Sequence, residues 1–147
     1  MDDSDDRLGA QLGGQLYLAH RYARAATNRA LQTHRLELRH LGVLTCLADA
    51  GPLSQRALVD RLQMDKSSMV YLIDELERRG LADRRKDERD RRSHAVHITP
   101  AGRDRLAAAT TTTEEVMTDL FAPLSPAERR QLHDLLARFI DHAAGRD

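Results

Sequence analysis

Tryptophan is absent from this sequence of 147 residues, and aromatic residues make up only 3% of it. A hydrophobic core must therefore be built from aliphatic side chains, mainly leucine and alanine, which favour helix over sheet. The apolar share of 41% is ordinary for a globular protein, and the length suits one domain. We therefore expect a single domain over residues 1–147.

Cysteine and long apolar runs are also scarce. The single cysteine, Cys46, excludes a disulfide within the chain and fits a reducing cytoplasm. No apolar run is long enough to cross a membrane, and no signal-peptide pattern opens the sequence. We therefore expect a cytoplasmic protein with no membrane partner. Cys46 lies between Leu44 and Leu47, which favours a buried structural thiol, with a redox-sensing thiol as the alternative.

Motifs of catalysis and of metal binding are missing as well. The sequence has no glycine-rich phosphate loop, nucleophile elbow or zinc-protease motif. Its seven histidines form no pair at i, i+4 and no cluster with cysteine. His94 and His97 are three residues apart in a predicted strand, so they point to opposite faces. We therefore predict a protein that is not an enzyme and that has no metal site and no cofactor.

Charge is balanced overall but uneven along the chain. The formal net charge is +0, which neither requires nor excludes nucleic acid, because binding depends on where the charges lie. Residues 1–6 are acidic, whereas residues 84–92 (RRKDERDRR) hold six basic and three acidic side chains. Such a run is most often a solvated loop, and only its neighbours in the fold give it a role in DNA binding.

Apolar residues recur at helical spacing over most of the chain. Ser54 and Asp65 are predicted N-caps of two short helices, and Gly80 ends the second. Two short helices joined by a tight turn form a helix-turn-helix. The longer predicted helices cover residues 8–31, 38–49, 100–120 and 125–143.

A β-hairpin is predicted directly after the helix-turn-helix. Two short strands, 81–86 and 94–99, flank the charged loop. The fold class is therefore mainly α with a small β-hairpin wing, a winged helix-turn-helix over residues 38–99. The apolar stripes at 8–34 and 101–144 are too long for a compact monomer to cover. We expect these segments to be dimerisation helices that pair with a second copy of the chain.

The second helix of a helix-turn-helix normally lies in the major groove of DNA. Here Met69, Leu72 and Ile73 occupy its inner face, which leaves polar side chains facing outward. The hairpin loop can place an arginine in the minor groove, with Asp90 as its brace through a bidentate pair. Arg92 is the expected groove residue, and Arg91 is the alternative. The candidate DNA-contacting residues are Ser54, Gln55, Lys66, Ser67, Ser68, Val70, Tyr71, Arg89, Asp90, Arg91 and Arg92.

Residues 53–105 resemble the winged helix-turn-helix of the MarR family. The segment LIDELERRGLADR is similar to the end of that family's recognition helix and its first wing strand. The segment DERDRRSHAVHITPAG is similar to its wing signature, and the flanking helices match in order and length. Val70 and Tyr71 stand where the family more often has threonine and arginine, which leaves the operator sequence open.

This resemblance implies an intertwined homodimer that binds a pseudo-palindromic operator in double-stranded DNA. It also implies a repressor that is released by a small aromatic or phenolic ligand bound between the dimer helices and the winged domain. Each candidate lining residue is equally well explained as an ordinary core or surface residue. These residues are Tyr17, His20, Arg24, His34, His40 and Leu41. Two other functions stay open: a thiol-based redox sensor acting through Cys46, and a DNA-independent protein-interaction module.

Overall fold

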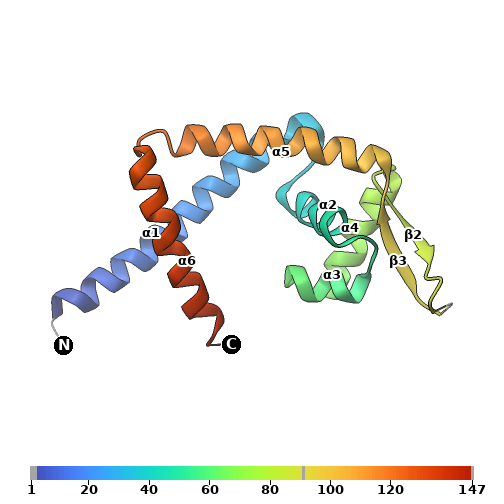
Figure 1. Cartoon of the computed structure of the whole chain (residues 1–147), viewed down its shortest axis with the longest axis horizontal. Helices are drawn as coiled ribbons and strands as arrows, with labels where there is room; N and C mark the ends of the chain where they lie inside the picture. The colour runs from blue at the N-terminus through green and yellow to red at the C-terminus, as the bar shows by residue number, and fades with distance from the viewer. Residues whose placement is uncertain (1–2, 91, 147) are drawn as a thin grey trace.

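The computed structural model describes residues 3–90 and 92–146. Figure 1 shows a body of short helices and strands at one end of a long helix, and two further long helices at the other end. The predicted mainly helical winged fold is confirmed. The elements in chain order are α1 (Asp3–Leu31), η1 (Gln32–His34), α2 (Leu38–Ala50), β1 (Leu53–Ser54), α3 (Gln55–Leu62), α4 (Lys66–Arg78), β2 (Ala82–Lys86), β3 (His94–Ile98), α5 (Pro100–Leu120) and α6 (Pro126–Ala144).

The core of the protein lies in the winged body, between α2, α4 and the sheet. Helix α4 buries its apolar stripe completely, as its spacing at i, i+3, i+4 and i+7 predicts. Because this face is fixed against the core, the opposite face of α4 has to point outward. The buried aliphatic side chains of the winged body are Val43, Leu44, Leu47, Leu58, Met69, Leu72, Ile73, Leu76, Leu81, Ala82 and Val96.

The sheet has three antiparallel strands in the order β1-β3-β2. Ala82 pairs with Ile98 in the predicted hairpin. The third strand, β1, was not predicted, and there Leu53 pairs with Val96. This short strand ties the start of α3 to the wing, so the helix-turn-helix and the hairpin share one framework.

Side-chain hydrogen bonds cap the N-termini of α3 and α4 at the predicted residues. The Ser54 hydroxyl accepts from the backbone N–H of Ala57 at 3.1 Å, and Asp65 caps α4. At the start of α5, the Thr99 hydroxyl accepts from the Gly102 N–H at 3.0 Å. A Cβ added to Gly102 would lie 2.0 Å from the Leu81 carbonyl oxygen. Glycine at this position therefore allows α5 to pack closely against the wing.

The long helices are only partly covered by the rest of the chain. The end of α1 packs on α5, where Thr27, Leu31 and Ala109 are buried. Residues 4–17 of α1 and the described residues of α6 hold no buried side chain. Figure 1 shows α6 at the end of α5 that lies away from the winged body. Within the described part of the chain, no helix has the length and apolar character needed to span a membrane.

Candidate nucleic-acid interface

The first turns of α4 form an exposed polar surface on the winged body. Lys66, Ser67 and Ser68 are exposed, and Tyr71 is 53% exposed one turn further on. Val70 is half-buried, so it is less open than the sequence predicts. Most side chains expected to contact DNA from this helix therefore share its outer face.

Asp65 controls the hydrogen-bonding capacity of Ser68. Its carboxylate accepts from the Ser68 backbone N–H at 2.8 Å and from the Ser68 hydroxyl at 2.6 Å. These bonds, with the hydroxyl contributing most, lower the pKa of the Asp65 carboxyl. The single hydroxyl proton of Ser68 is thus committed to Asp65, and its oxygen presents lone pairs to solvent.

Tyr71 is supported from the neighbouring helix α2. The guanidinium carbon of Arg39 lies 6.0 Å from the centroid of the Tyr71 ring, at the outer limit of cation–π attraction. Arg39 is itself paired with Glu37 at 2.6 Å and with Glu75 at 3.7 Å. These contacts hold a cation beside an aromatic ring on the outer face of α4.

The helix-turn-helix contributes a second group of candidates from the start of α3. Ser54 is exposed and Gln55 is half-buried. A hollow of about 380 Å³ lies between the starts of α3 and α4, and Gln55 and Lys66 both line it. The amide of Gln55 is held by Arg84 of β2, a residue that was not among the predicted site residues.

The wing loop is organised by two aspartates. Asp87 accepts from the backbone N–H of Arg89 at 2.9 Å, and Asp90 accepts from that of Arg92 at 3.0 Å. The Asp87 N–H donates to the Ser93 carbonyl oxygen at 3.0 Å and closes the loop. Both arginine side chains are exposed. The loop therefore presents cations to solvent from a braced backbone.

The proposed bidentate brace between Asp90 and an arginine takes a different form. Asp90 binds the backbone of Arg92, and no ion pair joins it to the Arg92 side chain within the described residues. A short-range turn of this kind orders only the loop, whereas an exposed ion pair must also order a long side chain for little gain. Arg91, the alternative groove residue, lies outside the described residues.

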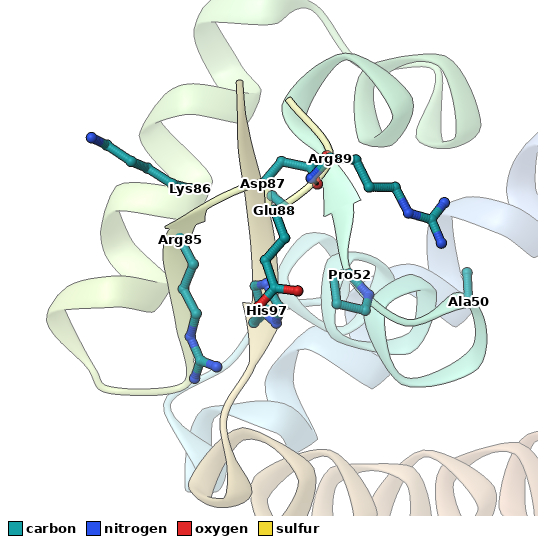
Figure 2. Close-up of a pocket in the computed structure, with 9 residues that line it drawn as sticks. Ala50, Pro52, Arg85, Lys86, Asp87, Glu88, Arg89 and His97 are labelled. Carbon is teal, nitrogen blue, oxygen red and sulfur yellow. Dashed lines mark hydrogen bonds between the residues drawn. The ribbon is translucent and has the colours of Figure 1, made fainter. Parts of the chain in front are cut away.

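A larger hollow of about 570 Å³ lies at the root of the wing. Figure 2 shows Lys86 and Arg89 extending away from the hairpin on opposite sides. Arg85 and Lys86 were not among the predicted DNA-contacting residues, and they extend the basic surface from the loop into β2. The lining is Ala50, Pro52, Arg85, Lys86, Asp87, Glu88, Arg89, Ala95 and His97.

The six candidate ligand-binding residues do not converge within one chain. Tyr17, His20 and Arg24 are exposed on α1. At the base of the winged body, His34 is hydrogen-bonded to the Thr112 hydroxyl at 2.7 Å, and His40 is buried with both ring nitrogens bonded to protein atoms. Leu41 packs against the core. The arrangement of His40 and Leu41 favours structural roles for both residues.

Cys46 is half-buried on α2 and packs against the core, so it is less buried than the sequence predicts. Within residues 3–90 and 92–146, no three histidine, cysteine, aspartate or glutamate side chains lie together as a metal-binding group.

Comparisons of sequence and of structure identify proteins that are similar to this chain. Residues 36–93 match the family model of the MarR family. A protein of Thauera aromatica, named as a transcriptional regulatory protein for the hcr operon, is 35% identical over 85% of this chain and 73% of its own. A solved MarR-family transcriptional regulator from Rhodococcus sp. RHA1 is 28% identical over 92% of this chain and 93% of its own, with a TM-score of 0.76.

A third relative is BpsR of Bordetella bronchiseptica, whose DNA binding is regulated by 6-hydroxynicotinic acid. Its solved structure is 28% identical over 88% of this chain and 98% of its own, with a TM-score of 0.76. In each of these relatives, the likeness extends beyond the winged body to the long flanking helices, because it covers more than two thirds of both chains.

Proposed function

Because the chain belongs to the MarR family of transcriptional regulators and is not an enzyme, we propose that it binds a pseudo-palindromic operator as a homodimer and represses the adjacent genes. The observation that carries this proposal is the outer face of α4. Its inner face is fully buried, so Lys66, Ser68 and Tyr71 point outward beside a basic wing. A helix presented in this way fits the major groove, while an arginine of the wing fits the narrow minor groove.

The uncovered apolar side chains of α1 and α6 support the homodimer. Leu12 is 51% exposed on α1, and Phe139 and Ile140 are 54% and 58% exposed on α6. Because these side chains are already about half covered, burying the rest would stabilise an assembly by roughly 0.7–1.5 kcal/mol each. Segments 8–34 and 101–144 are thus the dimerisation helices of this proposal. A two-fold dimer presents two copies of α4 to half-sites that are separated by a helical turn of DNA.

A small aromatic or phenolic ligand completes the proposal, and its binding releases the operator. The regulation of BpsR by 6-hydroxynicotinic acid supports this chemical class. Tyr17, His20 and Arg24 are exposed on α1, beside the surface assigned to the second copy. A phenol, an imidazole and a guanidinium suit an aromatic acid. Because chromosomal DNA is the proposed target, the protein is expected to work in the cytoplasm.

The test begins with genomic fragments selected by the purified protein. Binding to a selected fragment should weaken steeply with salt, because each neutralised phosphate releases counterions. Sedimentation at low micromolar concentration should give a dimer. A folded monomer at that concentration would contradict the proposed homodimer. DNA affinity that is poor and independent of salt would favour a protein-interaction module instead. Peroxide that weakens binding by the wild type, but not by Cys46→Ser, would favour the redox sensor.

A further inference from the structure

Arg84 connects the wing to both helices of the helix-turn-helix. Its Nε donates to Gln55 Oε1 of α3 at 2.7 Å. One terminal nitrogen contacts Asp74 at 2.8 Å and also pairs with Glu77, while the other donates to the Val70 carbonyl oxygen at 3.4 Å. The backbone N–H of Arg84 donates to Glu77 at 2.9 Å. One side chain of β2 therefore reaches α3 and α4 together.

This contact determines which end of the Gln55 amide faces outward. A guanidinium has five donors and no acceptor, so only the oxygen of the amide can face Arg84. The NH₂ group of Gln55 has no hydrogen-bond partner among the described residues. It is open to water, because no buried side-chain nitrogen or oxygen in the described part of the chain lacks a partner. Arg84 thus leaves Gln55 as a donor at the surface.

The surroundings of Gln55 suit an anion. Gln55 lines the hollow between α3 and α4 together with Arg56 and Lys66, which supply a guanidinium and an ammonium group. Asp60 lines the same hollow, and it is the one acidic residue in the lining. Two cations and a fixed amide donor outweigh one acid, so the local chemistry favours an acceptor of negative charge.

We propose that Arg84 fixes Gln55 as a hydrogen-bond donor to a phosphate of the DNA backbone. A wing strand thereby determines a contact made by the first helix of the helix-turn-helix. Phosphate oxygens only accept hydrogen bonds, so a Gln55 that could rotate its amide freely would present its oxygen part of the time and repel the phosphate. The inference rests on the proposed DNA-binding function and adds a positioning role for Arg84.

The first test compares two substitutions of Gln55 on a selected genomic fragment and on a mixed-sequence duplex. Gln55→Met removes the donor and should weaken binding to both duplexes about tenfold, as expected for a hydrogen bond to a charged group. Gln55→Glu keeps an oxygen for Arg84 but places a negative charge near the phosphate, so its loss should be larger. Its thermal unfolding midpoint should not fall, because the new carboxylate pairs with Arg84.

The second test asks whether Arg84 acts through Gln55. Arg84→Met and Gln55→Met should be strongly non-additive in DNA affinity, because each removes the same oriented donor. Arg85→Met is the matched control, since Arg85 pairs with Asp83 and not with Gln55. It removes the same charge from the adjacent residue of β2, and its effect should add to that of Gln55→Met. Additive losses for Arg84 as well would overturn the positioning role.

The outcomes separate this inference from the function on which it rests. A wild-type protein that binds neither duplex would overturn both. A wild type that binds with steep salt dependence, while Gln55→Glu binds equally well, would overturn the inference alone. A loss confined to one base pair of the operator would show a base contact and overturn the assignment to phosphate. Equal losses on both duplexes would support it.

Discussion

The imidazole of His40 and the carboxylate of Glu75 lie 2.9 Å apart, Nε2 to Oε2, and join α2 to the recognition helix α4. The backbone N–H of Glu37 donates to the other ring nitrogen, Nδ1, at 2.9 Å. Nδ1 therefore accepts, Nε2 donates to Glu75, and the ring is neutral. Burial, the largest influence, lowers the pKa of His40 below the ordinary histidine value and outweighs the hydrogen bond to Glu75, which raises it.

Acid should therefore destabilise the protein through His40. Because the folded-state pKa lies below the unfolded value of about 6.5, the unfolded chain binds the proton first as the pH falls. The free energy of unfolding should be fully maintained above that pH and should decrease below it. Urea unfolding between pH 7.5 and about 5 measures this slope. His40→Gln should flatten it, whereas His133→Gln, on the exposed surface of α6, should not.

Ser68 should read a base rather than a phosphate. Its hydroxyl proton is bound to Asp65, so its oxygen accepts from groups such as the amino groups of adenine or cytosine. Ser68→Ala should lose about 1–3 kcal/mol at one base pair and little elsewhere. Affinities for single-base-pair operator variants decide this. Ser67→Ala is the neighbouring control. If Ser68→Ala lost the same affinity for every operator variant, the assignment to a base would be contradicted.

Gly102→Ala should destabilise the junction between the wing and α5. The new Cβ would lie 2.0 Å from the Leu81 carbonyl oxygen and 2.9 Å from a carbon of Ile98. Because one of these is backbone, α5 must shift, at a cost of about 1–3 kcal/mol. Gly42→Ala is the matched control, since its Cβ would make only an ordinary contact with Leu62. Thermal unfolding should show Gly42→Ala to be neutral or more stable.

Local sequence rules predicted most of the fold. Helical spacing of apolar residues located the helices, and short polar residues located the starts of two of them, as the caps made by Ser54 and Asp65 confirm. Asp65 also illustrates the limit of this reasoning. Its capping role was predicted, but its bond to the Ser68 hydroxyl depends on side-chain geometry that the sequence does not contain.

Features that depend on distant partners were missed. Strand β1 exists because Leu53 pairs with Val96, and its two residues carry no strand pattern of their own. Arg84 falls in the predicted first wing strand, but it belongs to a run of charges of the kind that is most often solvated, so its contacts with α3 and α4 were not predicted. A signal was nevertheless present, because strand alternation puts Arg84 on the same face as the buried Ala82, and an inward arginine requires acidic partners such as Glu77.

A charge on α6 should separate the proposed dimer. Phe139 is 54% exposed, and the proposal buries it against a second copy. Phe139→Asp would place a carboxylate in that interface without a partner, which is expensive in a desolvated site. Sedimentation should then report a shift toward monomer or loss of folded protein at low micromolar concentration. Gln131→Asp, near the start of the same helix at an exposed position, makes the same change of charge and is the control. An unchanged dimer for Phe139→Asp would remove α6 from the interface.

Asp90 offers a test in which its charge and its role in loop geometry predict opposite effects of substitution on operator affinity. Its carboxylate accepts from the Arg92 backbone N–H and so orders the tip of the wing. Asp90→Ala should weaken operator binding by about 1 kcal/mol, roughly fivefold, because the loop loses the bond that presents its arginines. Arg92→Ala should weaken binding more strongly while the fold and dimer stay intact. Both are measured as dissociation constants at moderate salt.

Simple electrostatics predicts the reverse for Asp90, because removing an acid near DNA should tighten binding. Asp90→Asn separates the two effects, since an amide oxygen still accepts from the Arg92 N–H while the charge is gone. Asn should therefore bind at least as tightly as the wild type, and Ala less tightly. Glu88→Ala, which removes an exposed acid of the same loop, should also tighten binding. If Ala at position 90 binds as tightly as Asn, the Asp90 carboxylate acts only through its charge, and the loop is a diffuse basic patch.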